Sequence, residues 1–222
     1  MNYRLILIVI LISLLTITGS AFKMGGGGSF IVYQQYNVSE INALLATNNF
    51  PTLKSQGIGK GGFGYGRISA NYVAGGEGYS FSVKEKVGNK TSNIIINAGG
   101  FYLARQVNLA ESVSLRVGGT IGSFEKALIL REESVDPIQN REYSKLTQDG
   151  FLFKPQLNLA VNITPFAAIE IGLGKSFLFN TEGDSLDSIK VGNFPDVSLA
   201  IVFGLWYSDA NKWENAFKKK IT

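Results

Sequence analysis

The chain has 222 residues, a formal net charge of +4, and neither histidine nor cysteine. This length fits one or two domains, and no disulfide framework can form. The missing residue types exclude Ser-His and Cys-His catalysis and metal sites built on His or Cys. The weak, dispersed positive charge gives no basic stripe, so we expect no nucleic-acid partner.

Residues 1–21 have the pattern of a secretory signal peptide. A weakly basic start with Arg4 is followed by an almost unbroken run of Leu, Ile and Val from Leu5 to Leu15. Small residues then lead to an expected cleavage site after Ala21. The apolar run is shorter than the roughly 20 residues that a membrane-spanning helix needs. An uncleaved N-terminal anchor is the alternative.

Residues 22–28 hold four consecutive glycines, Gly25 to Gly28. We interpret them as a flexible leader, because phosphate-binding loops need a strand before the glycines and a helix after them. The barrel described below is expected over residues 29–208. Its first connection contains a short surface helix that Ser39 can cap, with Ile41, Leu44 and Leu45 as its apolar stripe.

Side chains alternate between apolar and polar along most of the remaining chain, which predicts strands with one apolar and one polar face. In residues 166–179, for example, Ile169, Ile171 and Leu173 alternate with Glu170 and Gly172. The pattern is equally clear in 112–123, 151–163 and 195–207. It is less regular in the glycine-rich segments 57–66, 69–84 and 91–105, where bulges or bends are expected. With a first strand at about 28–36, the sequence predicts eight strands.

The connections between these strands alternate in length. Longer ones are expected at 37–56, 87–90, 131–148 and 180–194, and short ones near 67, at 106–110 and at 164–165. Outer-membrane barrels combine longer outer loops with short periplasmic turns in this way. We therefore predict an all-β fold, an eight-stranded antiparallel up-and-down β-barrel with one short helix in the first long connection. Both termini lie on the periplasmic side, and a polar tail follows at 209–222.

Alternation alone does not say which face points inward, because a soluble barrel turns its apolar face in and a membrane barrel turns it out. Glycines and mid-strand charges share the polar face, which favours a crowded polar lumen. We expect a polar network in this lumen that plugs the barrel and does not conduct, formed by Arg116, Lys154 and Glu170, with Arg105 and Glu77 as further members. The alternative is that these charges only solvate the lumen.

Aromatic residues are expected to form two belts at the strand ends. The outer belt would hold Tyr79, Phe81, Phe124, Phe151, Phe153, Phe177 and Phe179. The periplasmic belt would hold Phe63, Tyr65, Tyr102, Phe166, Trp206 and Tyr207.

This layout resembles the small bacterial outer-membrane barrels, such as the opacity-type proteins and the transmembrane domain of outer-membrane protein A. The resemblance is architectural and covers most of the mature chain, so no functional residue is carried over. One departure is the polar tail, since members of that group commonly end on a terminal aromatic of the last strand. The resemblance implies an outer-membrane location, contact with membrane lipid and surface partners bound through the outer loops.

From these patterns we expect a monomeric, non-enzymatic barrel with a structural or surface-interaction role and with neither cofactor nor metal. Outer-membrane enzymes of lipid chemistry generally rely on His, and no spacing forces two carboxylates together. The acidic stretch Glu182, Asp184 and Asp187 matches no standard calcium loop. Two alternatives stay open: a soluble periplasmic barrel that binds an apolar ligand, and a small pore.

Overall fold

The computed structural model describes residues 25–69, 71–133, 141–164, 166–180 and 194–204. Eight antiparallel strands close into a barrel in chain order, with the first strand paired to the last. This confirms the predicted fold class. The elements are β1 (Gly25–Gln35), α2 (Ser39–Thr47), β2 (Gln56–Ser69), β3 (Tyr72–Val87), β4 (Lys90–Asn108), β5 (Val113–Glu132), β6 (Arg141–Thr164), β7 (Ala167–Asn180) and β8 (Phe194–Gly204).

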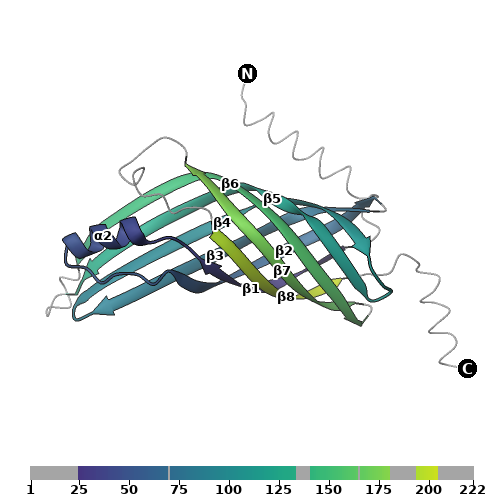
Figure 1. Cartoon of the computed structure of the whole chain (residues 1–222), viewed down its shortest axis with the longest axis horizontal. Coiled ribbons are helices and arrows are strands. Elements are labelled where there is room, and N and C mark those ends of the chain that lie inside the picture. The colour runs from purple at the N-terminus through teal and green to yellow at the C-terminus, as the bar shows by residue number, and fades with distance from the viewer. Residues whose placement is uncertain (1–24, 70, 134–140, 165, 181–193, 205–222) are drawn as a thin grey trace, which may run out of the picture.

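The strands are staggered around the barrel. The register partners of Ile31 can be followed around the barrel in either direction. Through β2 and β3 they lead to Asn97 of β4, and through β8, β7, β6 and β5 they lead to Val107 of the same strand. These two residues are ten positions apart along β4. A closed barrel needs such a stagger, which tilts the strands against its axis. The tilt is visible in Figure 1.

The two ends of the barrel differ. We call the end where β1 starts and β8 stops the terminus end, and the opposite end, next to α2, the lid end (Figure 1). β3 to β6 are the longest strands, at 16, 19, 20 and 24 residues, against 11 for β1 and β8. Their extra length lies at the lid end. There β6 continues beyond Gly150, its last residue paired with β7, and β3 continues beyond Phe81, its last residue paired with β2. These four strands therefore extend as a sheet beyond their neighbours.

The glycines predicted to be a flexible leader belong to the barrel. Gly25 to Gly28 form the start of β1 and pair with β2 on one side, while Gly26 to Gly28 also pair with β8 on the other. The prediction was wrong because it relied on side-chain alternation, which glycine cannot show, whereas strand pairing uses the backbone. The expected signal peptide and polar tail lie outside the described residues.

The helix is present as predicted, but it is not a surface helix. Ile41 and Leu45 are at most 1% exposed and pack inside the lid end, while Leu44 faces outward. Ser39 is the first helical residue and not its cap; its backbone N–H and its hydroxyl both donate to the side chain of Asn37.

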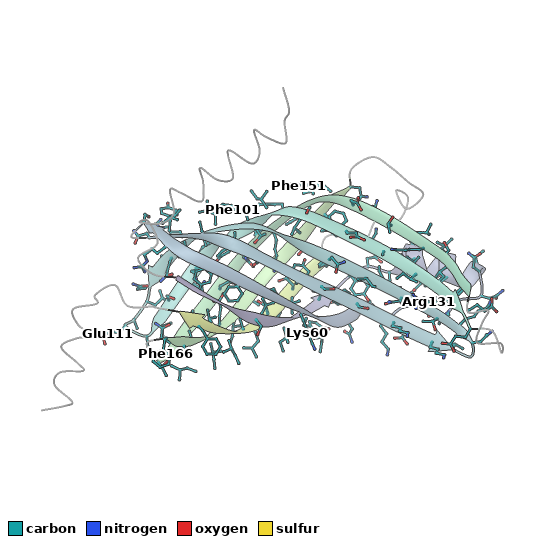
Figure 2. The ribbon with its side chains drawn as sticks, turned by 180° about the vertical axis from the view of Figure 1, so that it is seen from behind. Lys60, Phe101, Glu111, Arg131, Phe151 and Phe166 are labelled. Carbon is teal, nitrogen blue, oxygen red and sulfur yellow. The ribbon has the colours of Figure 1, made fainter. Side chains whose placement is uncertain are left out.

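The outward face of the barrel is mostly apolar. Figure 2 shows Phe101, Phe151 and Phe166 projecting away from the wall. Exposed apolar residues line β4 to β8 in particular, including Val117 (51%), Ile171 (49%) and Phe203 (62%). β2 and β3 instead present small outward residues between Lys60 and Ser80, among them Gly62, Gly64, Gly76 and Gly78.

The predicted aromatic belts are only partly present. Phe151, Phe153 and Phe179 face outward toward the lid end, and Phe166 faces outward at the terminus end. Other residues assigned to the belts point into the barrel and are buried, namely Tyr65, Tyr79, Phe81, Tyr102 and Phe124. Trp206 and Tyr207 lie outside the described residues. The lumen thus takes a share of the aromatic side chains, where they pack and where the hydroxyls of Tyr79 and Tyr102 take part in hydrogen bonds.

Candidate functional site

The lumen holds a set of buried charges from five strands. Strand alternation directs Arg116 of β5 and Glu170 of β7 inward, and the two form an ion pair. The Arg116 side chain is fully buried, and its guanidinium carbon lies 4.3 Å from the centroid of the Tyr65 ring. Asn158 of β6 is the register partner of Arg116 and is itself paired with Gly172 of β7. A glycine at this position leaves the space that the polar side chains around it occupy.

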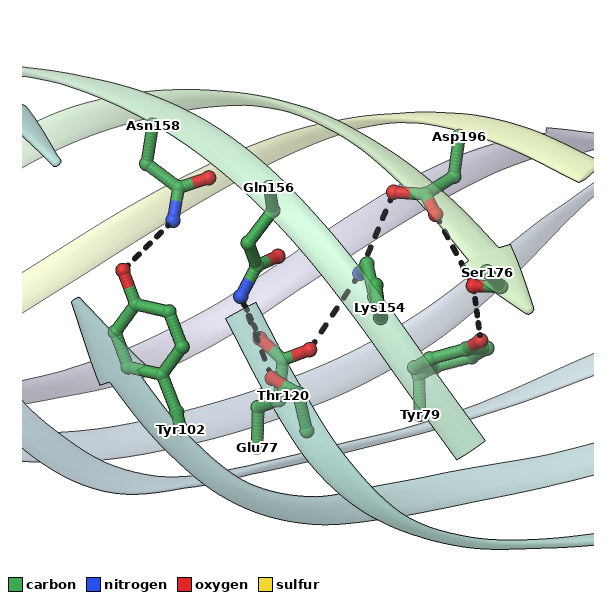
Figure 3. Close-up of polar contacts among 9 residues, drawn as sticks. All are labelled: Glu77, Tyr79, Tyr102, Thr120, Lys154, Gln156, Asn158, Ser176 and Asp196. Carbon is green, nitrogen blue, oxygen red and sulfur yellow. Dashed lines mark hydrogen bonds and ion pairs between the residues drawn. The ribbon is translucent and has the colours of Figure 1, made fainter. Parts of the chain in front are cut away.

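Lys154 of β6 links opposite walls of the barrel. Its Nζ lies 3.5 Å from a carboxylate oxygen of Glu77 on β3 and 3.3 Å from one of Asp196 on β8. Figure 3 shows the ammonium group between these two carboxylates. Its Nζ also lies 5.2 Å from the centroid of the Tyr79 ring. One side chain of β6 therefore contacts β3 and β8, two strands that are far apart in the sequence.

Hydrogen bonds extend these ion pairs. Gln156 Nε2 donates to Glu77 at 2.9 Å and lies 3.4 Å from the hydroxyl oxygen of Thr120. Ser176 lies 3.3 Å from Asp196 and 3.1 Å from the Tyr79 hydroxyl, and Asn158 donates to Tyr102 at 3.1 Å (Figure 3). We call this whole set the lumen network: Glu77, Tyr79, Tyr102, Arg116, Thr120, Lys154, Gln156, Asn158, Glu170, Ser176 and Asp196.

The buried charges of the lumen network are paired. Arg116 pairs with Glu170, and Lys154 lies between Glu77 and Asp196. Pairing matters because a buried charge without a partner is far more costly than a pair, while a well-paired set can be near neutral in free energy. Such a set fixes the relative positions of β3, β5, β6, β7 and β8.

The lumen network leaves little open space. A cavity of about 20 Å³ lies among Tyr65, Glu77, Arg116, Lys154 and Glu170. That volume holds about one water molecule. In the described part of the chain, no three or more Asp or Glu side chains are arranged to hold a metal ion. The lumen network positions the strands and fills the lumen, and the carboxylates of Glu77 and Asp196 both pair with Lys154.

Four of the five residues predicted for the lumen are there: Glu77, Arg116, Lys154 and Glu170. Arg105 is not, because it lies on the outward, exposed face of β4. The alternation near it is hidden by three consecutive isoleucines, residues 94–96, and by the pair Gly99-Gly100. The prediction missed Asp196. Its neighbour Val197 lies on the apolar face of β8, so alternation assigns Asp196 to the polar face.

Helices do not supply a membrane span in the described residues, since none is long and apolar enough to cross a bilayer. The lid end of the barrel carries exposed ion pairs. At the lid end Lys86 contacts Glu133 at 2.6 Å, with both side chains about half exposed, and lowers the pKa of the Glu133 carboxyl.

Comparison with known proteins shows the fold. No protein-family model matches the sequence, and no curated protein matches it. Among solved structures, Ail, the attachment invasion locus protein of Yersinia pestis in complex with the heparin analogue sucrose octasulfate, is similar with a TM-score of 0.52 and 12% identity, over 82% of this chain and 99% of that one. Neisserial surface protein A (TM-score 0.48, 9% identity) and the outer membrane protein OprG from Pseudomonas aeruginosa (0.42, 8%) were also found, over 82% and 83% of this chain and 97% and 95% of theirs. The chain therefore shares the architecture of small bacterial outer-membrane barrels.

Proposed function

We propose that the protein is an outer-membrane β-barrel with a closed polar lumen and a structural or surface-interaction role, without catalytic activity. The observation that carries the proposal is the inverted distribution of polarity. Large apolar side chains such as Ile171 and Phe203 are about half exposed on the outside, while Arg116 and Lys154 are buried inside. A soluble barrel that binds an apolar ligand has the opposite arrangement.

Strand geometry supports a bilayer as the surrounding solvent. Every backbone group of a closed barrel can pair within the sheet, which is what the hydrocarbon region demands. A spanning strand needs about 9–11 tilted residues, and the shortest strands here have 11. In this arrangement the terminus end lies in the periplasm and the lid end faces outward.

A surface role is supported by the extension of β3 to β6 at the lid end. These strands hold the connection at 88–89 away from the bilayer, and function on rigid scaffolds concentrates in such connections. The lumen network supports the closed state, because the cavity among its charged side chains has a volume of about 20 Å³, enough for about one water molecule.

The decisive experiment is membrane fractionation of the expressed chain, followed by gel electrophoresis with and without boiling. We expect the protein in the outer-membrane fraction, with a folded band that shifts in mobility on boiling. Recovery as a soluble periplasmic protein would overturn the location and favour the ligand-binding alternative.

The closed lumen is tested separately in planar bilayers. The folded protein should give no large, steady conductance. A stable open level would contradict the closed lumen and support the pore alternative, while leaving the membrane location intact.

A further inference from the structure

The lumen changes character toward the lid end. Beyond the lumen network, most inward side chains of β3, β4, β5 and β8 are apolar and form one cluster with the residues of the first connection, while Ser92 of β4 and Lys126 of β5 are buried polar residues on the same face. We call the space that these strands enclose the outer chamber; its walls are Phe81, Val83, Ile94, Ile96, Leu128, Leu130 and Phe194, with Leu146 and Leu178 packed against them.

The connection that contains α2 fills this chamber. We call residues 36–55 the lid. Its apolar side chains Ile41, Leu45, Phe50 and Leu53 are buried against the chamber walls. Figure 1 shows α2 at the end of the barrel, alongside the strands that extend furthest. The lid thus occupies, with its own side chains, a volume that would otherwise accept an apolar guest.

The lid is closed on itself. The backbone N–H of Tyr36 donates to the carbonyl of Ser55 at 2.9 Å, which joins the two ends of the segment. Inside it, Asn42 donates to the Leu53 carbonyl at 2.9 Å and accepts from the Leu53 N–H at 2.8 Å. Because its two ends adjoin, the lid can leave the chamber walls without any change in the pairing of β1 with β2.

The charged contacts of the lid with the wall are weakly held. Lys54 pairs with Glu85 of β3 at 3.2 Å while 72% exposed, and Lys90 of β4 lies 5.0 Å from the centroid of the Phe50 ring. Exposed ion pairs contribute little to stability. Apolar contacts therefore hold the lid in place, and an apolar ligand can replace apolar contacts.

The closed chamber also contains polar atoms that lack hydrogen bonds. The hydroxyl of Tyr36, at the neck of the lid, and the hydroxyl of Ser92 on β4 are buried without a hydrogen-bond partner. Buried polar groups in native proteins are nearly always satisfied, and each exception calls for a physical reason. A ligand head group that donates and accepts hydrogen bonds would satisfy them.

We propose that the outer chamber is a binding site for a single-chain amphiphile, an acyl chain with one hydrogen-bonding head group, and that the lid opens to admit it. The chain packs against the apolar walls in place of the lid, and the head group bonds to the orphaned polar atoms. The lumen network closes the floor, so the ligand enters and leaves from the lid end. The site depends on the barrel geometry and goes beyond the proposed surface role.

The first test locks the lid. The natural chain has no Cys, so a double variant K54C/E85C can be joined specifically with a short thiol-to-thiol cross-linker. The matched control is K86C/E133C, which joins an equally exposed ion pair on the barrel wall. Each folded barrel is titrated in amphipol with a fluorescent undecanoic acid, and native mass spectrometry counts the bound molecules.

We expect one probe molecule for each wild-type and control barrel, and at least a tenfold loss of affinity when the lid is locked. Equal affinity of the locked and unlocked barrels would overturn the proposal, as would no binding to the wild type. Both outcomes are independent of where the barrel resides in the cell, and the mobility shift on boiling verifies that each variant is folded.

The second test loosens the lid. K54E places two carboxylates together and should raise probe affinity about two- to fivefold, because a ligand's apparent affinity rises with the population of the binding-competent state. The charge-swapped pair K54E/E85K should restore the wild-type value. K86E breaks the exposed ion pair on the wall and should leave affinity unchanged; an equal rise with K86E would contradict a specific role of the lid.

Discussion

At the scale of single residues, the stability of the lumen depends on charges that cannot be removed one at a time. Arg116 is wholly buried, and its Glu170 partner is almost so. Removing one member of a buried ion pair leaves the other without compensation, whereas removing both can be nearly neutral. The pair is therefore better described as a requirement for a particular arrangement of strands than as a source of stability.

Arg116→Met should lower the free energy of unfolding by about 3–5 kcal/mol, because Glu170 then remains buried without a cation. The double variant R116M/E170Q should recover a large part of that loss. Urea unfolding in lipid vesicles, followed by the gel mobility of the folded form, measures both. The control is Lys86→Met, which removes an exposed ion pair and should change stability by less than about 1 kcal/mol. Equal losses for R116M and K86M would contradict the burial argument.

The sequence predicted the charged residues of the lumen where alternation was regular. Arg116, Lys154 and Glu170 stand in strands with a clean period of two, so their phase was readable, and the structure directs them inward. Arg105 follows a stretch in which the outward Ile95 is as apolar as its inward neighbours. The sequence therefore does not show which face of the strand Arg105 occupies. Which carboxylate meets which cation depends on the stagger of the strands, and that is a property of the closed barrel.

At the scale of the elements, glycine has two different roles on the two faces of the wall. On the inward face, a Cβ on Gly75 of β3 would come closer than 3.0 Å to the backbone of Gly64 and Tyr65. On the outward face, a Cβ on Gly64 of β2 would meet nothing within 4 Å. The first glycine permits close packing of the strands, and the second merely leaves the outer surface bare.

This difference predicts opposite effects of the same substitution. Gly75→Ala should destabilise the barrel by about 1–3 kcal/mol, as expected for overpacking. Gly64→Ala should be neutral or stabilise it by about 0.5 kcal/mol, because alanine loses less conformational freedom in a strand. The denaturant midpoint of each folded variant checks this. A similar loss in both variants would show that glycine is required on either face.

The lid shows what a short periodic pattern can and cannot predict. The presence of the helix in the first long connection follows from the sequence, but its burial does not. Only Ile41 and Leu45 of the helix are buried, and the remaining apolar contacts come from irregular residues on both sides, such as Val38 and Phe50. Those residues show no periodicity, so nothing local in the sequence distinguishes a loop that folds inward from one that faces solvent.

At the scale of the whole molecule, the two ends of the barrel differ in their connections and should differ in accessibility. Lys145 is an exposed residue of β6 at the lid end, and Glu111 is exposed in the short turn between β4 and β5 (Figure 2). With the orientation proposed above, Lys145→Cys should react on intact cells with a polyethylene-glycol maleimide too large to enter porins. Glu111→Cys should react only after the outer membrane is permeabilised. The reverse pattern would invert the topology while leaving the fold unaffected.

The pairing of β1 with β8 has a consequence for the time course of folding. Gly26 pairs with Gly204, so the contact that closes the barrel joins residues nearly a whole chain apart. Contacts of such separation form late, because loop-closure entropy must be overcome before they yield any stabilisation. Until then both edge strands expose unpaired backbone, which is where aggregation begins. The chain is therefore most prone to aggregation before its last strand is in place, and its slowest folding step should be the closure of this seam.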